Sequence, residues 1–214
     1  MDALVVGAMV ALAGLGLAGA NHLHDRGAPG TLSRRIAPAL AGAGYLAGVL
    51  WLDMWAAVWA SAGLALALAA LRLGFRQALR GISRSESRWD LGELAYPLAA
   101  TASLAIGWGL LGDRWLGFLP VAFMSWGDSM AGLTRQAFRW RGRPDRHWGS
   151  AAMLGVCLAV AALLDPYWAG ALAALAATIA ERSRLLAHRF WAGNWIPDDP
   201  VIVAASLGVM AAVH

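Results

Sequence analysis

The amino-acid sequence predicts an all-α integral membrane protein, a single-domain helical bundle over residues 1–214 with about eight transmembrane helices, within a range of seven to nine. Three observations predict this fold. Of the 214 residues, 59% are hydrophobic and only 14% are charged, whereas soluble proteins average roughly 25% charged residues. The apolar residues gather in runs of about 15–20, the length that crosses a bilayer. Basic residues gather between alternate runs.

Eight apolar runs follow one another along the chain. They cover residues 3–20, 37–52, 54–71, 91–111, 115–133, 148–164, 167–180 and 199–213. Several runs have only about 14–16 residues, so one or two of them are compatible with half-crossings or re-entrant segments. Pro97 and Pro120 predict kinks in two of the runs, because each proline removes a helical hydrogen bond.

The arginines predict the orientation of the bundle. The chain has 17 arginines and no lysine, and 16 of the arginines lie beside every second connection between runs. The alternate connections carry only Arg114 together with Asp53, Asp113 and Asp165. The positive-inside rule places the basic connections in the cytoplasm, and both termini outside. Because this alternation requires an even number of crossings, the charge pattern supports the count of apolar runs.

Residues that are absent or rare exclude several classes of protein. Without lysine there is no lysine-containing phosphate loop, no protein-kinase strand lysine and no Schiff-base enzyme. Cys157 is the only cysteine, so one chain forms neither a disulfide framework nor a multi-cysteine zinc site. The net charge of +4 fits an anionic membrane surface. We therefore expect a phospholipid bilayer as a partner, and no nucleic acid.

A regular arginine pattern follows the third run. Arginines recur every four residues from Arg72 to Arg88, with apolar residues between them. This spacing predicts a basic amphipathic helix that lies on the anionic inner surface of the membrane.

Two carboxylates interrupt apolar runs. Asp128 lies near the end of the run 115–133, and Glu93 lies near the start of the run 91–111. Because an unpaired charge in hydrocarbon is costly, such residues are candidates for function. Both lie toward the predicted cytoplasmic end of the bundle.

The sequence around Asp128 is typical of a helix boundary beside a phosphate site. Gly127 is suited to end one helix and Asp128 or Ser129 to cap the next, which would direct the amides of residues 129–131 toward an anion that carries Mg²⁺. The following stretch is rich in groups that bind phosphate, namely Arg135, Arg139, Arg143, Arg146, His147, Gly149 and Ser150. A capping aspartate ahead of an ordinary positive-inside loop explains these residues equally well.

Four motif-like segments follow in order over roughly residues 90–200. Residues 92–98 are Gly-Glu-Leu-Ala-Tyr-Pro-Leu, residues 127–131 are Gly-Asp-Ser-Met-Ala, residues 146–153 are Arg-His-Trp-Gly-Ser-Ala-Ala-Met, and Glu181 is followed by Asn194 and Pro197. Their order resembles the G-E-x-x-Y-P-L, G-D-[SG]-x-A, K-[ST]-x-x-G-S-x-A-M and late E and D-N-x-x-x-P signatures of the CTP-dependent polyprenol kinases, with the third and fourth segments each one residue shorter than the family's pattern. That family includes dolichol kinase and phytol kinase and is distantly similar to the phosphatidate cytidylyltransferases.

Three positions depart from the family's pattern. Pro38 stands where the family's R-K-x-x-H segment has histidine, Arg146-His147 replaces lysine followed by serine or threonine, and Gly193 replaces an aspartate before Asn194. Arginine can replace lysine as a phosphate-binding charge, although with a different geometry. Loss of this carboxylate is expected to weaken metal binding, and the nearby Asp198 and Asp199 are candidate replacements.

The resemblance implies transfer of the terminal phosphoryl group of CTP, or of another nucleoside triphosphate, to the hydroxyl of a phytol- or polyprenol-type alcohol at the cytoplasmic face. It implies Mg²⁺ (or Mn²⁺) held by Asp128 with Glu181 or Asp198. Glu93 is expected to act beside Asp128 and Glu181 in catalysis, and its position alone, at the depth where a lipid hydroxyl would arrive, suggests that it orients or deprotonates the alcohol. The nucleotide phosphates would lie against Gly127, Ser129, Arg135, Arg139, Arg143, Arg146, His147, Gly149, Ser150 and Asn194.

Other functions explain part of the same pattern. A CDP-lipid-forming cytidylyltransferase or a CTP-dependent diacylglycerol kinase would use the same nucleotide and metal. A non-catalytic transporter or scaffold would use Asp128 and Glu93 only as paired charges inside the bundle. The sequence leaves the acceptor alcohol, the nucleotide base and the oligomeric state open.

Overall fold

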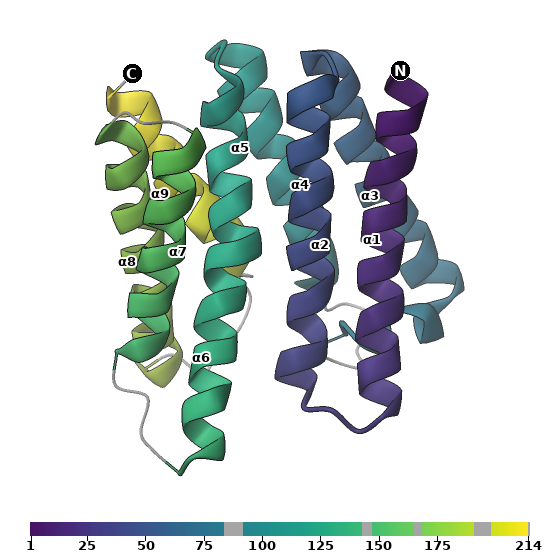
Figure 1. The fold of residues 1–214 in the computed structure, drawn as a ribbon, viewed down its shortest axis with the longest axis vertical. Coiled ribbons are helices and arrows are strands. Elements are labelled where there is room, and N and C mark those ends of the chain that lie inside the picture. Colours follow the sequence, from purple (N-terminus) through teal and green to yellow (C-terminus); the bar gives the residue numbers. More distant parts are fainter. Residues whose placement is uncertain (84–91, 143–146, 165–167, 191–197, 214) are drawn as a thin grey trace.

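The computed structural model describes residues 1–83, 92–142, 147–164, 168–190 and 198–213. These residues form helices and no β-strand, so the predicted all-α class is confirmed for them (Figure 1). The elements are α1 (Asp2–Asp25), α2 (Gly30–Trp51), α3 (Met54–Gly74), the 3₁₀ turn η1 (Arg76–Leu79), α4 (Gly92–Ser103), the π-helix η2 (Leu104–Leu110), α5 (Arg114–Ala122), the π-helix η3 (Phe123–Gly127), α6 (Asp128–Trp140), α7 (Trp148–Leu164), α8 (Trp168–Phe190) and α9 (Asp198–Val213).

The described helices combine into eight rods that match the eight apolar runs. The π-helix η2 continues α4 directly, and η3 joins α5 to α6, so residues 92–110 and 114–140 each form one rod. The fifth and seventh rods extend beyond their apolar runs, to Trp140 and Phe190, and carry basic residues on these extensions. The chain begins and ends at the same end of the bundle, whereas the α1–α2 connection and the end of α6 lie at the opposite end (Figure 1).

Among the described helices, α1 and α3 are long and apolar enough to cross a membrane. Their most apolar stretches have mean hydropathies of 2.2 and 1.8. Helix α7 and residues Pro200–Val213 are apolar but shorter. The fourth and fifth rods are each divided between α-helical and π-helical segments, so no single α-helix in them has the full length.

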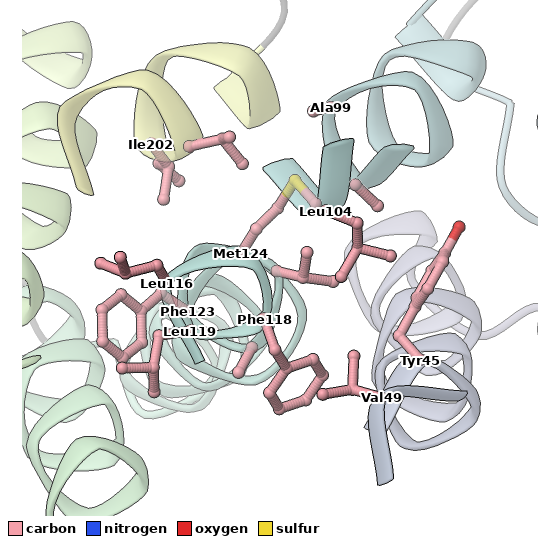
Figure 2. Packing of buried hydrophobic residues seen from close by; sticks show 14 of the residues in the cluster. Tyr45, Val49, Ala99, Leu104, Leu116, Phe118, Leu119, Phe123, Met124 and Ile202 are labelled. Atoms are coloured by element: carbon pink, nitrogen blue, oxygen red, sulfur yellow. The ribbon is translucent and has the colours of Figure 1, made fainter. Parts of the chain in front are cut away.

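The core of the bundle surrounds α5. Every residue from Leu116 to Ser125 is buried, because α2, α4, α7, α8 and α9 all pack against this rod. Figure 2 shows Phe118 and Phe123 on this central rod, with Ile202 of α9 on one side and Tyr45 of α2 on the other. A helix that is apolar on all sides is expected to be buried in this way.

Glycines allow the closest helix contacts. A Cβ built on Gly42 of α2 would lie 2.6 Å from Ser125 Cβ, so only glycine lets α2 approach η3 this closely. Gly107 of η2 faces the backbone of Leu116 and Gly117 in the same way. Small residues at such contacts favour tight helix packing where hydrophobicity alone cannot drive association.

The expected amphipathic helix after the third run is wrong over residues 75–83. Helix α3 ends at Gly74, and a 3₁₀ turn and a hydrogen-bonded turn follow. Asn21 of α1 holds this segment: its Nδ2 donates to the Ala78 carbonyl at 2.7 Å, and its Oδ1 accepts from the Gly81 amide at 2.8 Å. Arg80 adds an exposed ion pair with Asp25, with Nη2 2.5 Å from Oδ2. These tertiary contacts outweigh the four-residue spacing. The rest of the pattern, residues 84–88, lies outside the described residues.

Candidate functional site

A cavity of about 440 Å³ lies between α1, α2, α3 and α4 and reaches η3 and α6. Apolar side chains of α1 and α3 form two of its walls, and among these are Val10, Leu17, Leu64, Leu68 and Leu71. Its charged lining residues in the described part of the chain are Arg34, Arg35, Glu93 and Asp128. The cavity therefore brings together the two carboxylates that interrupt apolar runs, and it does so beside a long apolar surface.

Asp128 lies at the start of α6 and is paired across the bundle. It is 5% exposed, and its Oδ2 accepts a hydrogen bond from Arg35 Nη1 of α2. A Cβ on Gly132, one turn further along α6, would lie 2.5 Å from Arg35 Nε. Gly132 therefore leaves the space in which the guanidinium reaches Asp128. This ion pair compensates the buried carboxylate.

The expected helix break at Gly127 is wrong. Gly127 has φ −63° and ψ −56°, and Asp128 has φ −65° and ψ −34°, so both are helical and no side chain caps α6. The Asp128 amide donates to the Phe123 carbonyl, five residues back, as in a π-helix. The rod is continuous, and residues 129–131 present no helix N-terminus to an anion. A π-helical turn at this place changes the direction of Asp128 without ending the helix.

Glu93 is the second carboxylate of the cavity. It lies in the first turn of α4, and its Oε2 accepts from Arg72 Nη1 of α3. The two side chains are 3% and 5% exposed. Arg72 is therefore a buried partner of Glu93, and does not lie on the membrane surface as its place in the arginine pattern suggested.

Glu181 of α8 pairs with Arg135 of α6, with Oε1 and Nη2 2.6 Å apart. Gly149, at the start of α7, makes room for this contact, because a Cβ there would lie 2.6 Å from Arg135 Nε. Arg135 follows Asp128 by seven residues, about two turns, on α6, so Glu181 is held against the same side of this helix as Asp128. Within the described part of the chain, Glu181 Oε2 is buried and accepts no hydrogen bond.

Hydrogen bonds join the motif segments to one another. The Tyr96 hydroxyl lies 2.7 Å from Ser125 Oγ and donates to the Pro38 carbonyl at 3.3 Å. Trp126 Nε1 donates to the Ala39 carbonyl at 3.0 Å, and Ser129 Oγ donates to the Arg35 carbonyl at 3.3 Å. These hydrogen bonds thus join the segments around residues 35, 96 and 128 to one another.

The remaining predicted residues that the structure describes do not line the cavity. Gly127 packs against Cys157 and Met153, and Ser129 is buried against α2, so both support the helix packing. Arg139 and His147 are exposed, and Ser150 is half-buried. Arg143, Arg146, Gly193 and Asn194 lie outside the described residues, as does the side chain of Asp198.

The donor set around Asp128 fits Mg²⁺ in part. The described residues contain no group of three or more histidine, cysteine or carboxylate side chains that could hold a metal ion. Magnesium, however, is commonly held by one or two carboxylates together with substrate phosphates. Asp128 and Glu181 supply two carboxylates, and Glu181 Oε2 retains its acceptor capacity.

Arg35 and Arg72 are the functional candidates that the sequence analysis missed. The available signal was charge balance, since a carboxylate inside an apolar run needs a partner. The sequence does not specify which of 17 arginines supplies it, because Arg35 and Asp128 are 93 positions apart.

Comparison of the chain with protein-family models, with curated proteins and with solved structures gives no match. The resemblance to the polyprenol kinases is therefore carried by the motifs alone.

Proposed function

We propose that the protein is a membrane lipid-alcohol kinase, which transfers the terminal phosphoryl group of CTP, or of another nucleoside triphosphate, to a phytol- or polyprenol-type alcohol. The observation that carries this proposal is the cavity, in which Glu93 and Asp128 meet two arginines at one end of an apolar surface. Such a combination suits a ligand with a hydroxyl head and a hydrocarbon chain. The order of the four motifs supports the same function.

The apolar walls supply the place for the alcohol's chain. Leu17 of α1 and Leu64 and Leu68 of α3 line the cavity beyond its charged residues. An isoprenoid chain that lies against them directs its hydroxyl toward Glu93 and Asp128. Burial of the chain there contributes roughly 25 cal/mol for each Å² of apolar surface removed from water.

The charged residues supply the chemistry of the transfer. The hydroxyl oxygen attacks the terminal phosphorus as its proton passes to the Glu93 carboxylate, and the bond from phosphorus to the bridging oxygen breaks to release CDP. Arg72 fixes the position of Glu93. Arg35 and Arg135 provide guanidinium groups for the negative charge on the phosphate oxygens.

Asp128 and Glu181 are the proposed ligands of Mg²⁺ (or Mn²⁺), with Asp198 as a further candidate. Mg²⁺ held by these carboxylates would supply positive charge for the oxygens of the nucleotide phosphates. The pairing of both carboxylates with arginines keeps their charges compensated in the protein alone.

The proposed membrane arrangement is a multi-pass bundle of eight spans, with both termini outside and the site facing the cytoplasm. Two features support it. The eight rods match the eight apolar runs, and 16 of 17 arginines lie beside alternate connections. The site residues Arg35, Asp128 and Arg135 lie near that basic end.

Analysis of the reaction products distinguishes a lipid-alcohol kinase from a CDP-lipid-forming cytidylyltransferase. The full chain in lipid nanodiscs is given Mg²⁺, a panel of prenols and diacylglycerol, and CTP labelled at either the terminal or the inner phosphate. A kinase transfers the terminal label to the lipid and releases CDP. A cytidylyltransferase transfers the inner label to a lipid phosphate and releases pyrophosphate. Label from neither position in any lipid, with ATP tested in parallel, would contradict both enzymes.

A non-catalytic transporter or scaffold is the second candidate. The observation that favours it is that Asp128, Glu93 and Glu181 each have an arginine partner, as structural charges in a bundle require. This candidate predicts that the folded protein binds no nucleotide and that Asp128→Asn changes only stability.

A further inference from the structure

We propose that the charged end of the cavity binds a phosphate monoester, and that Arg35 receives this phosphate by exchanging partners with Asp128. The inference rests on the proposed function and names the ligand class of the same cavity: an isoprenoid alcohol that carries a terminal phosphate, the product of the transfer.

The arrangement of the arginines carries the first step. Arg34 and Arg35 lie in the first two turns of α2, and both line the cavity together with Thr31. Guanidinium groups bind phosphate through paired hydrogen bonds, which makes two neighbouring arginines a suitable receptor for a phosphate dianion. Carboxylates do not attract such an ion, so Asp128 and Glu93 cannot be its binding groups.

The three buried pairs differ in access, and this difference identifies Arg35 as the residue that exchanges. The side chains are 23% and 7% exposed in the Arg35–Asp128 pair, 16% and 6% in the Arg135–Glu181 pair, and 5% and 3% in the Arg72–Glu93 pair. Arg35 lines the cavity, whereas Arg72 and Arg135 do not. A ligand in the cavity therefore reaches the Arg35 guanidinium while Arg72 stays with Glu93.

Gly132 gives the Arg35 guanidinium its space. The guanidinium packs against the bare backbone at position 132, where a Cβ would lie 2.5 Å from Nε and 2.9 Å from Cζ. No side chain at this position holds the guanidinium against Asp128. Transfer of Arg35 to a phosphate would leave the Asp128 carboxylate without its partner, and thus free to take a cation.

The apolar walls favour a lipid phosphate as the source of this group. The charged end opens directly onto the surfaces of α1 and α3, which a free phosphate or a nucleotide would not cover. A phosphorylated isoprenoid fills both parts of the cavity at once.

Equilibrium binding to the full chain in neutral nanodiscs, without nucleotide, tests the exchange. The probes are geranylgeranyl monophosphate, geranylgeraniol, inorganic phosphate and CTP. We expect the monophosphate to bind at least tenfold more tightly than the alcohol, and Arg35→Gln to remove about tenfold of that advantage while alcohol binding is kept. Arg26→Gln, an exposed arginine at the same end of the bundle, is the matched control and is expected to bind as the native protein does.

Monophosphate binding by the Asp128→Asn variant distinguishes an Arg35 that exchanges partners from an Arg35 that only supports the fold. If Asp128 competes with the phosphate for Arg35, this substitution tightens monophosphate binding several-fold, and the gain disappears in the double variant with Arg35→Gln. A gain that persists without Arg35 would mean simple charge repulsion and would overturn the exchange.

Three further outcomes would overturn the proposal. The first is that the alcohol and the monophosphate bind equally well. The second is that only CTP binding depends on Arg35, and the third is that inorganic phosphate binds as tightly as the lipid phosphate and depends on Arg35. Assay of phosphoryl transfer on the same preparation separates these failures from failure of the kinase function, because transfer can persist when the product phosphate is not held by Arg35.

Discussion

Gly149 of α7 lies directly against the guanidinium of Arg135 on α6. A Cβ at position 149 would lie 2.6 Å from Arg135 Nε and 3.0 Å from Cζ. Because Arg135 pairs with Glu181, this glycine determines whether α6 and α8 can be joined by an ion pair. The same relationship recurs between Gly132 and Arg35, which pairs with Asp128. Gly149, inside the motif segment 146–153, and Gly132, directly after the segment 127–131, thus each leave space for an arginine.

Substitution of Gly149 by alanine is expected to displace Arg135 from Glu181. The Cβ would meet Arg135 Nε at 2.6 Å and Cγ at 2.7 Å, which are side-chain and not backbone atoms, so the fold should survive a shift of this side chain. Phosphoryl transfer should fall by about tenfold as one charge-assisted contact is lost. Initial rates and the midpoint of thermal unfolding check this. Gly155→Ala in the same helix meets no atom within 4 Å and is the matched control, expected to keep full activity. Equal activity of the two variants would exclude a role for the Arg135 position.

The Arg72–Glu93 pair offers a test of whether Glu93 has a chemical role. Arg72→Met leaves a buried carboxylate unpaired and is expected to lower stability by about 3–5 kcal/mol, whereas Arg72→Met combined with Glu93→Gln should recover most of that loss. Thermal unfolding measures both effects. If Glu93 receives the proton of the alcohol, the stable double variant remains inactive in phosphoryl transfer. Full activity of the double variant would show that Glu93 is only the partner of Arg72.

The turn after α3 is expected to depend on Asn21. Asn21→Ala leaves the Gly81 amide and the Ala78 carbonyl without their partner and should lower stability by about 1–2 kcal/mol. His22→Ala, an exposed neighbour on α1, is the control and should have little effect. Hydrogen exchange of residues 78–82 provides the local readout. Unchanged protection in Asn21→Ala would mean that the turn is held by other contacts.

The proposed orientation is tested by cysteine labelling at the two ends of α1. Asp2 and His24 are both exposed, and Arg141 is exposed at the end of α6. In a Cys157→Ala background, a membrane-impermeant maleimide should label Asp2→Cys in intact cells, and His24→Cys and Arg141→Cys only after permeabilisation. Labelling of Asp2→Cys and His24→Cys from the same side would contradict a membrane-spanning α1.

Much of the helical framework is predictable from the sequence, because the length of an apolar run determines where a helix can be buried. The eight rods match the eight runs for this reason. The helix break at Gly127 was wrong, since Gly, Asp and Ser act as local turn signals only where tertiary packing permits a turn. Here Cys157 and Met153 pack against Gly127, and α2 packs against Ser129, so the helix continues.

The sequence predicts the carboxylates of the candidate site, but not the arginines with which they pair. Asp128 and Glu93 stand out as charges inside apolar runs, whereas Glu181 was identified only by the motif resemblance, and the structure places the first two at one cavity. Their partners come from helices distant in sequence, as in the pair Arg35–Asp128. Only the three-dimensional packing of α2 against α6 determines that pairing.

The placement of the acceptor alcohol beside Glu93 and Asp128 is tested most directly by photocrosslinking. A geranylgeraniol analogue with a diazirine in its chain is activated with the full chain in nanodiscs, and the labelled residues are identified by mass spectrometry. The predicted result is crosslinks to the cavity walls at Leu17, Leu64 and Leu68. An excess of unmodified geranylgeraniol should compete these crosslinks away. The substitution Ala67→Trp, at the cavity lining, should prevent them. Crosslinks confined to exposed side chains away from the cavity, such as Trp59 and Leu163, would contradict it.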